Sequence, residues 1–305
     1  MRAGVRRPWS LAAPRARRLM LVGLLVAALL GCSPDSGGGA SRGGPGPPVA
    51  KARSTHDRPS APYRVRSQVV SHGAVHTLRV WAPAATGRWP VVFAVPGSSG
   101  HKASLDTLAQ ALATRGVVVL TTDYRPDETE EAVTRELECG YRYARRVAGG
   151  FGGDLQRPVT VLGYSRGARA IWSGLDARRF GRGGAFDGCF SGAPRPDVVV
   201  AVDGCYYAWG GMSYAFPPSR LRAGDASMVL VSGEADDVCP TWQSRRAARA
   251  LEAAGHRTTL VTIPGANHYN PVFHDDVNGR HVTVPDDPGG VQTVQAVLHA
   301  IHEAE

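Results

Sequence analysis

The segment Gly163-Tyr164-Ser165-Arg166-Gly167 constrains the possible folds of this chain more than any other stretch. It follows a short apolar run, residues 159–162, and precedes a stretch compatible with a helix, residues 168–172. Between a strand and a helix, Gly-x-Ser-x-Gly is typical of a tight turn in which the serine takes a strained backbone conformation. Small neighbours let the strand and the helix approach closely, so that the hydroxyl is pushed out at the edge of the sheet. The start of the helix offers backbone N–H groups to a developing negative charge.

The remaining pattern predicts a mostly parallel sheet covered by helices on both faces. Continuous apolar runs indicate buried strands, and they alternate with stretches of helical period. The predicted strands are residues 91–95, 117–120, 159–162, 198–202, 228–231 and 258–263, and the predicted helices are residues 104–115, 128–147, 242–254 and 291–302 besides the one after Ser165. Residues 63–71 and 74–81 alternate and predict an N-terminal antiparallel hairpin. In such sheets, active sites form at the carboxyl ends of the strands.

The first 60 residues have the composition of an export signal followed by a tether. Residues 1–31 contain six arginines, no acid and an apolar run too short to span a membrane. The run ends in Leu29-Leu30-Gly31-Cys32, which resembles a bacterial lipobox, although Leu30 is bulkier than the residue usual there. This predicts Cys32 as a lipidated first residue, residues 32–60 as a Gly/Pro/Ser-rich flexible tether, and residues 61–305 as one α/β domain. We therefore expect an exported protein anchored by lipid on the outer side of a membrane.

The positive charge of the chain lies partly in the export signal. The chain has 35 basic and 26 acidic residues, and without the six arginines of residues 1–31 there are 29 basic residues. No basic patch indicates a nucleic-acid partner. The glycine-rich residues 149–153 follow a helix rather than a strand and lack a Lys-Ser/Thr pair, which argues against a phosphate-binding loop.

Four cysteines follow Cys32, namely Cys139, Cys189, Cys205 and Cys239. An even number in an exported chain suggests two disulfides, and the sequence permits three connectivities. Cys205 and Cys239 each come just after a predicted strand, and neighbouring parallel strands have their carboxyl ends close together. We therefore favour Cys205–Cys239 with Cys139–Cys189. A metal site is not expected, because no CxxC or HxxxH spacing accompanies these residues.

The order of elements and loops from residue 63 onward resembles the α/β-hydrolase family. Four segments carry the resemblance: the Ser165 turn, Pro96-Gly97-Ser98 after a strand, the loop of residues 233–240, and Gly265-Ala266-Asn267-His268 after the last strand. The family often has a histidine where Pro96 stands. This departure leaves the essential group intact, because the donor of that loop is a backbone amide.

The resemblance implies a catalytic triad in the chain order Ser165, Asp236, His268. Ser165 would attack an acyl carbonyl, His268 would serve as base and then as acid, and Asp236 would orient the imidazole. The backbone N–H groups of Ser98 and Arg166 would form the oxyanion hole.

Two other acids compete with Asp236. Asp237 is its neighbour in the chain, and Asp203 ends the preceding predicted strand, where some members of the family place their acid.

Several further polar residues have simpler alternatives to a role in the site. His101 could line the pocket or lie in a solvated loop, and His274 and His281 are expected at the surface. Asp123 is expected to be structural. The side chain of Arg166 could contact substrate, but a salt bridge on the helix surface is the simpler expectation.

These expectations together indicate a carboxylesterase, nearest to dienelactone-hydrolase-like and secreted esterases, that acts on a small-molecule or lipid-like ester without a metal or an organic cofactor. Aromatic residues between 206 and 218 suggest either a short lid over the pocket or plain packing. An acyltransferase or a peptidase could use the same triad. A catalytically silent binding module of the cell envelope is an alternative from a different class.

Overall fold

The structure, a computed structural model, describes residues 62–72, 76–175, 194–209, 212–215, 226–278 and 280–305. All of these residues belong to one compact unit, residues 57–305. The predicted export signal, Cys32 and the tether lie outside the described residues, as do Cys189 and the end of the predicted lid. Among the described helices, none has the length and apolarity needed to cross a bilayer.

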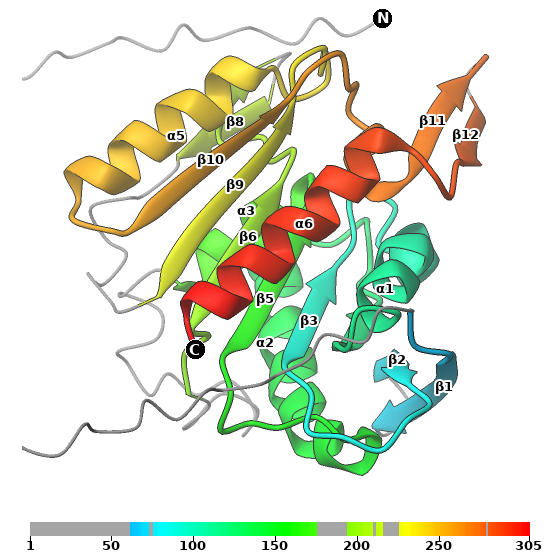
Figure 1. Ribbon diagram of the computed structural model, residues 1–305. Helices are drawn as coiled ribbons and strands as arrows, with labels where there is room; N and C mark the ends of the chain where they lie inside the picture. Colours follow the sequence, from blue (N-terminus) through cyan, green and yellow to red (C-terminus); the bar gives the residue numbers. More distant parts are fainter. Residues whose placement is uncertain (1–61, 73–75, 176–193, 210–211, 216–225, 279) are drawn as a thin grey trace, which may run out of the picture. The chain divides into compact units, whose positions relative to one another are not determined.

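An eight-stranded mixed sheet forms the centre of the fold (Figure 1), in the order β1-β2-β4-β3-β5-β6-β9-β10. Its strands are β1 (Val65–His72), β2 (His76–Pro83), β3 (Val91–Val95), β4 (Val118–Thr122), β5 (Val159–Tyr164), β6 (Val198–Val202), β9 (Ser227–Gly233) and β10 (Thr258–Ile263). β2 pairs antiparallel with both β1 and β4, whereas every pair from β4 to β10 is parallel. The predicted mostly parallel sheet and N-terminal hairpin are confirmed.

Helices cover both faces of this sheet. They are α1 (Asp106–Ala113), α2 (Glu130–Ala148), α3 (Arg166–Leu175), α5 (Thr241–Ala253) and α6 (Pro288–Glu303), with short 3-10 helices at Lys102–Leu105, Gly149–Phe151 and Asn270–Val272. α1 and α6 pack on one face, and α2, α3 and α5 pack on the other. In Figure 1, α6 crosses in front of the strands.

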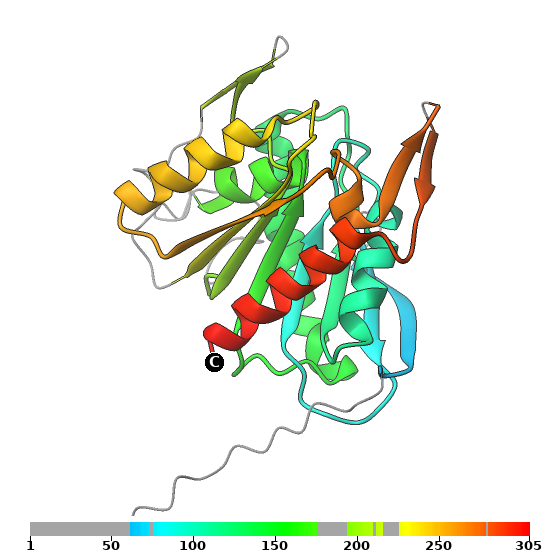
Figure 2. The same cartoon turned by 45° about the horizontal axis from the view of Figure 1, so that its top comes forward.

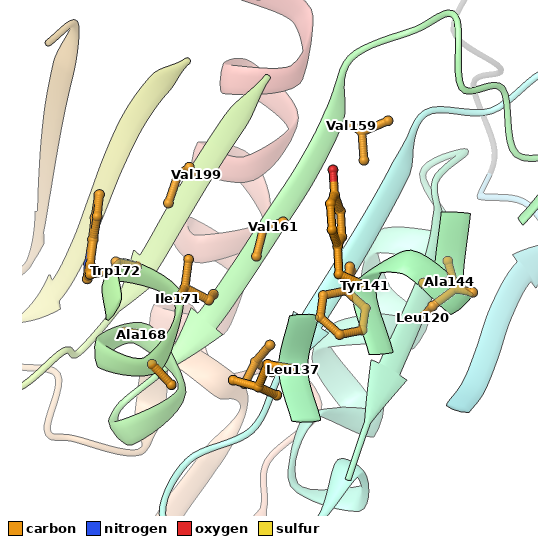
Figure 3. Packing of buried hydrophobic residues seen from close by; sticks show 14 of the residues in the cluster. Leu120, Leu137, Tyr141, Ala144, Val159, Val161, Ala168, Ile171, Trp172 and Val199 are labelled. Atoms are coloured by element: carbon orange, nitrogen blue, oxygen red, sulfur yellow. The ribbon is translucent and has the colours of Figure 1, made fainter. Parts of the chain in front are cut away.

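The strands are apolar throughout because each face meets helices. In β3, Phe93 packs toward α2 and α3, while Val92 and Ala94 pack toward α1. Figure 3 shows the first of these layers, where Leu137 of α2 and Ile171 of α3 lie against the sheet. Burying a side chain of this size contributes roughly 1.5–3 kcal/mol, so the two layers supply most of the driving force for folding.

Helix α2 begins two residues later than the sequence predicts, and its cap explains why. The Thr129 side chain accepts a hydrogen bond from the Ala132 N–H at 3.2 Å. Glu130 and Glu131 occupy the first turn, where negative charge complements the helix dipole. Thr129 therefore ends the preceding loop and fixes the start of the helix.

Two small antiparallel ribbons are additions that sequence reasoning missed. They are β7 (Tyr207–Trp209) with β8 (Met212–Ala215), inside the predicted aromatic lid, and β11 (His274–Val277) with β12 (Arg280–Thr283). The second ribbon projects beyond the sheet (Figure 2). The Asn278-Gly279 pair is a strong hairpin signal that could have revealed it.

The turn between β5 and α3 is possible only because its two glycines lack side chains. A Cβ on Gly163 would lie 2.6 Å from the Ala168 nitrogen, inside the first turn of α3. A Cβ on Gly167 would overlap the carbonyl oxygen of Pro96 and lie 2.6 Å from that of Val95. The glycines thus allow α3 to pack directly against β5 and against the loop that follows β3.

We expect Gly167→Ala to destabilise the protein by roughly 1–3 kcal/mol, because the methyl group would meet backbone atoms that cannot turn aside. Gly149→Ala is the matched control. Gly149 has a helical φ of −58°, and a Cβ added to it would meet no atom of the described residues within 4 Å. The control should be neutral or stabilising by about 0.4–1 kcal/mol. Urea unfolding of the two variants measures the difference, and equal stabilities would contradict the packing argument.

Candidate active site

Ser165 lies at the tip of the turn between β5 and α3. Its φ of +53° is in the left-handed region that non-glycine residues seldom adopt. Its N–H donates to the Val202 carbonyl at 2.8 Å, which extends the pairing of β5 with β6 by one residue. The serine therefore has the strained conformation that the sequence pattern predicts.

Three side chains from the carboxyl ends of β5, β9 and β10 form one hydrogen-bonded chain. His268 Nε2 lies 3.0 Å from Ser165 Oγ, and His268 Nδ1 lies 2.8 Å from Asp236 Oδ2. All three residues are buried. With Nδ1–H donated to the carboxylate, Nε2 is free to accept the serine proton. The structure thus brings together Ser165, Asp236 and His268.

The Asp236 carboxylate is held on its other side by its own loop. Oδ1 accepts hydrogen bonds from the N–H groups of Val238 and Cys239, at 2.9 and 2.7 Å. Cys239 forms a disulfide with Cys205, which ties this loop to the segment after β6. The loop therefore fixes the direction in which the acid faces His268.

The predicted Cys205–Cys239 disulfide is present, with 4.9 Å between the Cα atoms. Cys139, on α2, is also disulfide-bonded, and Cys189, its predicted partner, lies outside the described residues.

Asp236, Cys239 and His268 place ligand-type atoms within 4.8 Å of one another. This cluster is a poor metal site, because the Cys239 sulfur is in a disulfide and the His268 ring is bonded to both Asp236 and Ser165.

The two competing acids take other positions. Asp237 is exposed, and the ring of His268 bonds to Asp236 instead. Asp203 is fully buried behind the acid loop, where its Oδ1 accepts the Gly233 N–H at 2.8 Å.

The other predicted histidines lie away from this chain of hydrogen bonds. His101 is exposed on its loop. His274 Nε2 donates to the Ser104 carbonyl at 2.9 Å. His281, on β12, is exposed, and its ring lies 4.1 Å from the ring of Tyr269, the residue after His268.

The loop after β3 passes close to Ser165. A Cβ on Gly97 would lie 3.3 Å from the Cβ of Ser165. The Gly97 carbonyl accepts the Gly100 N–H at 3.0 Å and the buried hydroxyl of Tyr124. Because C=O and N–H point in opposite directions across a trans peptide, these bonds turn the Ser98 N–H away from Tyr124. No described residue accepts a hydrogen bond from that N–H.

Tyr124 is an anchor that sequence reasoning missed. Its N–H also donates to the Gly100 carbonyl at 2.9 Å, so that the tyrosine holds the loop at two points. Burial raises the pKa of the Tyr124 hydroxyl to about 12, which keeps it a donor at neutral pH. The Asp-Tyr-Arg segment after β4 contains it, but nothing in the local pattern shows where the hydroxyl points.

The side chains of Arg166 and Asp123 form the salt bridges expected of structural residues. Arg166 Nε pairs with Glu130 at 3.1 Å, and its guanidinium donates to the Glu128 carbonyl at 2.8 Å. Asp123 accepts the Lys102 N–H at 2.8 Å and pairs with the Lys102 ammonium. The guanidinium of Arg166 is thus held by the segment that leads into α2.

Comparison with known proteins gives one family and many structures. Residues 208–283, which include Asp236 and His268, match the prolyl oligopeptidase family (Peptidase_S9). No curated protein sequence matches significantly.

Solved structures with a similar fold include three hydrolase-type proteins. A butyrate-bound esterase, Est2, from the planctomycete Thermogutta terrifontis is 19% identical with a TM-score of 0.58, over 81% of this chain and 95% of that one. A truncated carbohydrate esterase from gut microbiota is 17% identical with a TM-score of 0.62, over 80% and 98%. A proposed dienelactone hydrolase from Klebsiella pneumoniae is 17% identical with a TM-score of 0.57, over 79% and 99%. The strand order, the Gly-x-Ser-x-Gly turn and these likenesses together identify the chain as a protein of the α/β-hydrolase fold.

Proposed function

We propose that the protein is a serine hydrolase that cleaves carboxylic esters through an acyl-enzyme. The observation that carries this proposal is the hydrogen-bonded chain from Ser165 Oγ through His268 to Asp236. Esterases among the proteins of similar fold support it. A serine hydroxyl is a weak nucleophile until a neighbouring imidazole removes its proton, and this geometry supplies that imidazole.

The reaction would proceed in two halves. As Ser165 Oγ bonds to the acyl carbon, its proton moves to His268 Nε2, and Asp236 stabilises the imidazolium. The carbonyl oxygen becomes an oxyanion beside the N–H groups of Ser98 and Arg166. When it collapses, His268 gives the proton to the departing alcohol. Water then attacks the acyl-enzyme by the same route and releases the acid.

The oxyanion donors would contribute a large part of the rate. Arg166 is the first residue of α3, so its N–H has no partner within the helix. Ser98 lies in the loop that Tyr124 anchors. Loss of one such donor typically costs about 10²–10³ in kcat.

A peptidase is the second candidate, because residues 208–283 match the prolyl oligopeptidase family. The same triad cleaves amides when the leaving amine is protonated by the histidine. Parallel assays with p-nitrophenyl esters and with peptidyl p-nitroanilides distinguish the two candidates. Hydrolysis of esters alone supports the esterase, and an alcohol acceptor added to the ester assay reveals any acyl transfer.

We expect a fluorophosphonate probe to label the protein at Ser165 and not to label Ser165→Ala. Only an activated serine reacts with such electrophiles at a useful rate. One of the structurally similar proteins, the Thermogutta esterase, is phosphorylated by paraoxon. Labelling is measured by intact mass, with circular dichroism to verify that both proteins are folded. A folded wild-type protein that stays unlabelled would favour the silent binding module.

We expect Asp236→Asn to lower kcat by roughly 10³–10⁴, because an amide cannot stabilise the imidazolium or hold the right tautomer. Asp237→Asn is the matched control, since this neighbouring carboxylate is exposed. It should retain most of the activity. Ester hydrolysis by the two variants measures the difference, and the reverse pattern would assign the acid to Asp237.

We further propose that the protein is exported and anchored through Cys32, on the basis of the lipobox-like residues 29–32. A cysteine that carries two or more acyl chains can anchor a protein stably without a spanning helix. We expect Cys32→Ala to move the protein from the membrane fraction to the soluble fraction of the producing bacterium. Retention of the variant in the membrane fraction would refute the lipid anchor.

A further inference from the structure

Asp203 is a fully buried acid that the reaction described above does not use. It directly follows β6, and its φ of +44° is again in the left-handed region. Its N–H donates to the Val231 carbonyl at 2.9 Å, and its Oδ1 accepts the Gly233 N–H at 2.8 Å. Gly233 is the last residue of β9, where the loop that carries Asp236 begins. Asp203 is thus fastened to the base of the acid loop.

The Asp203 side chain also neighbours the Asp236 carboxyl group. Oδ2 of Asp203 is buried, and no described donor reaches it. The two carboxyl groups lie within hydrogen-bonding distance of each other. Two adjacent buried carboxyl groups do not both ionise readily, because like charges repel strongly in a buried setting. One of them therefore carries a proton and donates a hydrogen bond to the other.

The hydrogen bonds decide which carboxyl carries the proton. Asp236 receives the N–H groups of Val238 and Cys239 and the Nδ1–H of His268. Asp203 receives one N–H, that of Gly233. More donors stabilise the charged form, so Asp236 is the carboxylate and Asp203 is the acid.

The electrostatic surroundings of Asp203 agree with this assignment. Burial, and next the charge of Asp236, raise the pKa of Asp203 well above its usual range. Two titratable tyrosines, Tyr164 and Tyr206, lie close enough to feel a charge on Asp203. Burial raises the pKa of both tyrosines, so they are neutral and offer no counter-charge.

We propose that Asp203 is a positioning residue of the active site, a neutral carboxylic acid whose O–H donates to Asp236 and holds that carboxylate toward His268. The proposal rests on the proposed function. The order from the surface inward is then Ser165, His268, Asp236, Asp203. The rear hydrogen bond links the acid loop to β6, beside the point where the Cys205–Cys239 disulfide makes a second link.

Two substitutions separate the hydrogen bonds of Asp203 from its backbone conformation. Asp203→Asn keeps a donor for Asp236 and an acceptor for Gly233, and asparagine tolerates positive φ. Asp203→Gly removes the side chain, and glycine also tolerates positive φ. Both are compared with Asp237→Asn, which changes an exposed carboxylate.

The first measurement is thermal stability against pH, and it does not need catalysis. An acid with a raised folded-state pKa keeps its proton in the folded protein but loses it on unfolding above about pH 3.9. Its contribution to stability is therefore present below that pH and is lost as pH rises toward the folded-state pKa. Asparagine has no proton to lose. We expect the Tm of Asp203→Asn minus that of wild type to increase by several degrees between about pH 5 and about pH 8. A difference in Tm that does not change with pH would refute the assignment of a proton to Asp203.

The second measurement is ester hydrolysis against pH. We expect Asp203→Gly to lose about 10²-fold in kcat with KM changed little, because a misplaced acid misplaces the imidazole. Asp203→Asn should recover at least about tenfold of that loss, as rescue by a retained donor. It should also leave the acid-limb pKa of kcat/KM unchanged, since no charge is removed. Full activity of Asp203→Gly, or a fall of that pKa by a unit or more in Asp203→Asn, would overturn the proposal.

The two measurements keep this proposal apart from the proposed function. A wild-type protein without ester turnover refutes the esterase, while the pH dependence of Tm still tests the proton on Asp203. If Asp203→Gly does not fold, the proposal is tested with Asp203→Asn alone. The two readouts are then the pH dependence of its Tm and the pH dependence of its kcat/KM.

Discussion

The close contact of backbone with backbone around Ser165 is the constraint on which the site depends. Gly163 lets the first turn of α3 lie against β5, and Gly167 lets α3 lie against the carbonyl groups of Val95 and Pro96. This contact sets the distance between the serine and the loop after β3, and it forces Ser165 into positive φ. The packing of α3 in the core supplies the energy that holds a residue in this unfavourable conformation.

The parallel sheet brings the remaining side chains to the same edge. β5, β6, β9 and β10 are consecutive neighbours, and their carboxyl ends carry Ser165, Asp203, Asp236 and His268. The pairing of Val202 with Val231 places Asp203 beside the end of β9. The site is therefore a consequence of strand register, which is set by the two apolar layers rather than by the polar residues themselves.

Burial strengthens the hydrogen bonds of this site and makes an unpaired polar atom costly. His268, Asp236 and Asp203 are each less than a tenth exposed, so each hydrogen-bonding atom needs a partner from the protein. The acid loop supplies two backbone donors, the Cys205–Cys239 disulfide limits the movement of that loop, and Asp203 fastens its base. A loop held at this many points keeps the histidine in one orientation, which is what a general base requires.

The sequence by itself determined the sheet and its helices, the Ser165 turn and the two loops that carry Asp236 and His268. These features follow from patterns of neighbouring residues: continuous apolar runs, glycine spacing, and short loops after strands. Local patterns could not decide between Asp236, Asp237 and Asp203, because adjacent or strand-end carboxylates look alike in a sequence. The tertiary structure decided it, since Asp237 faces outward, Asp236 faces His268, and Asp203 lies behind. The anchoring of Gly97 by Tyr124 was likewise invisible, because distances between side chains of different strands depend on register and packing across the whole domain.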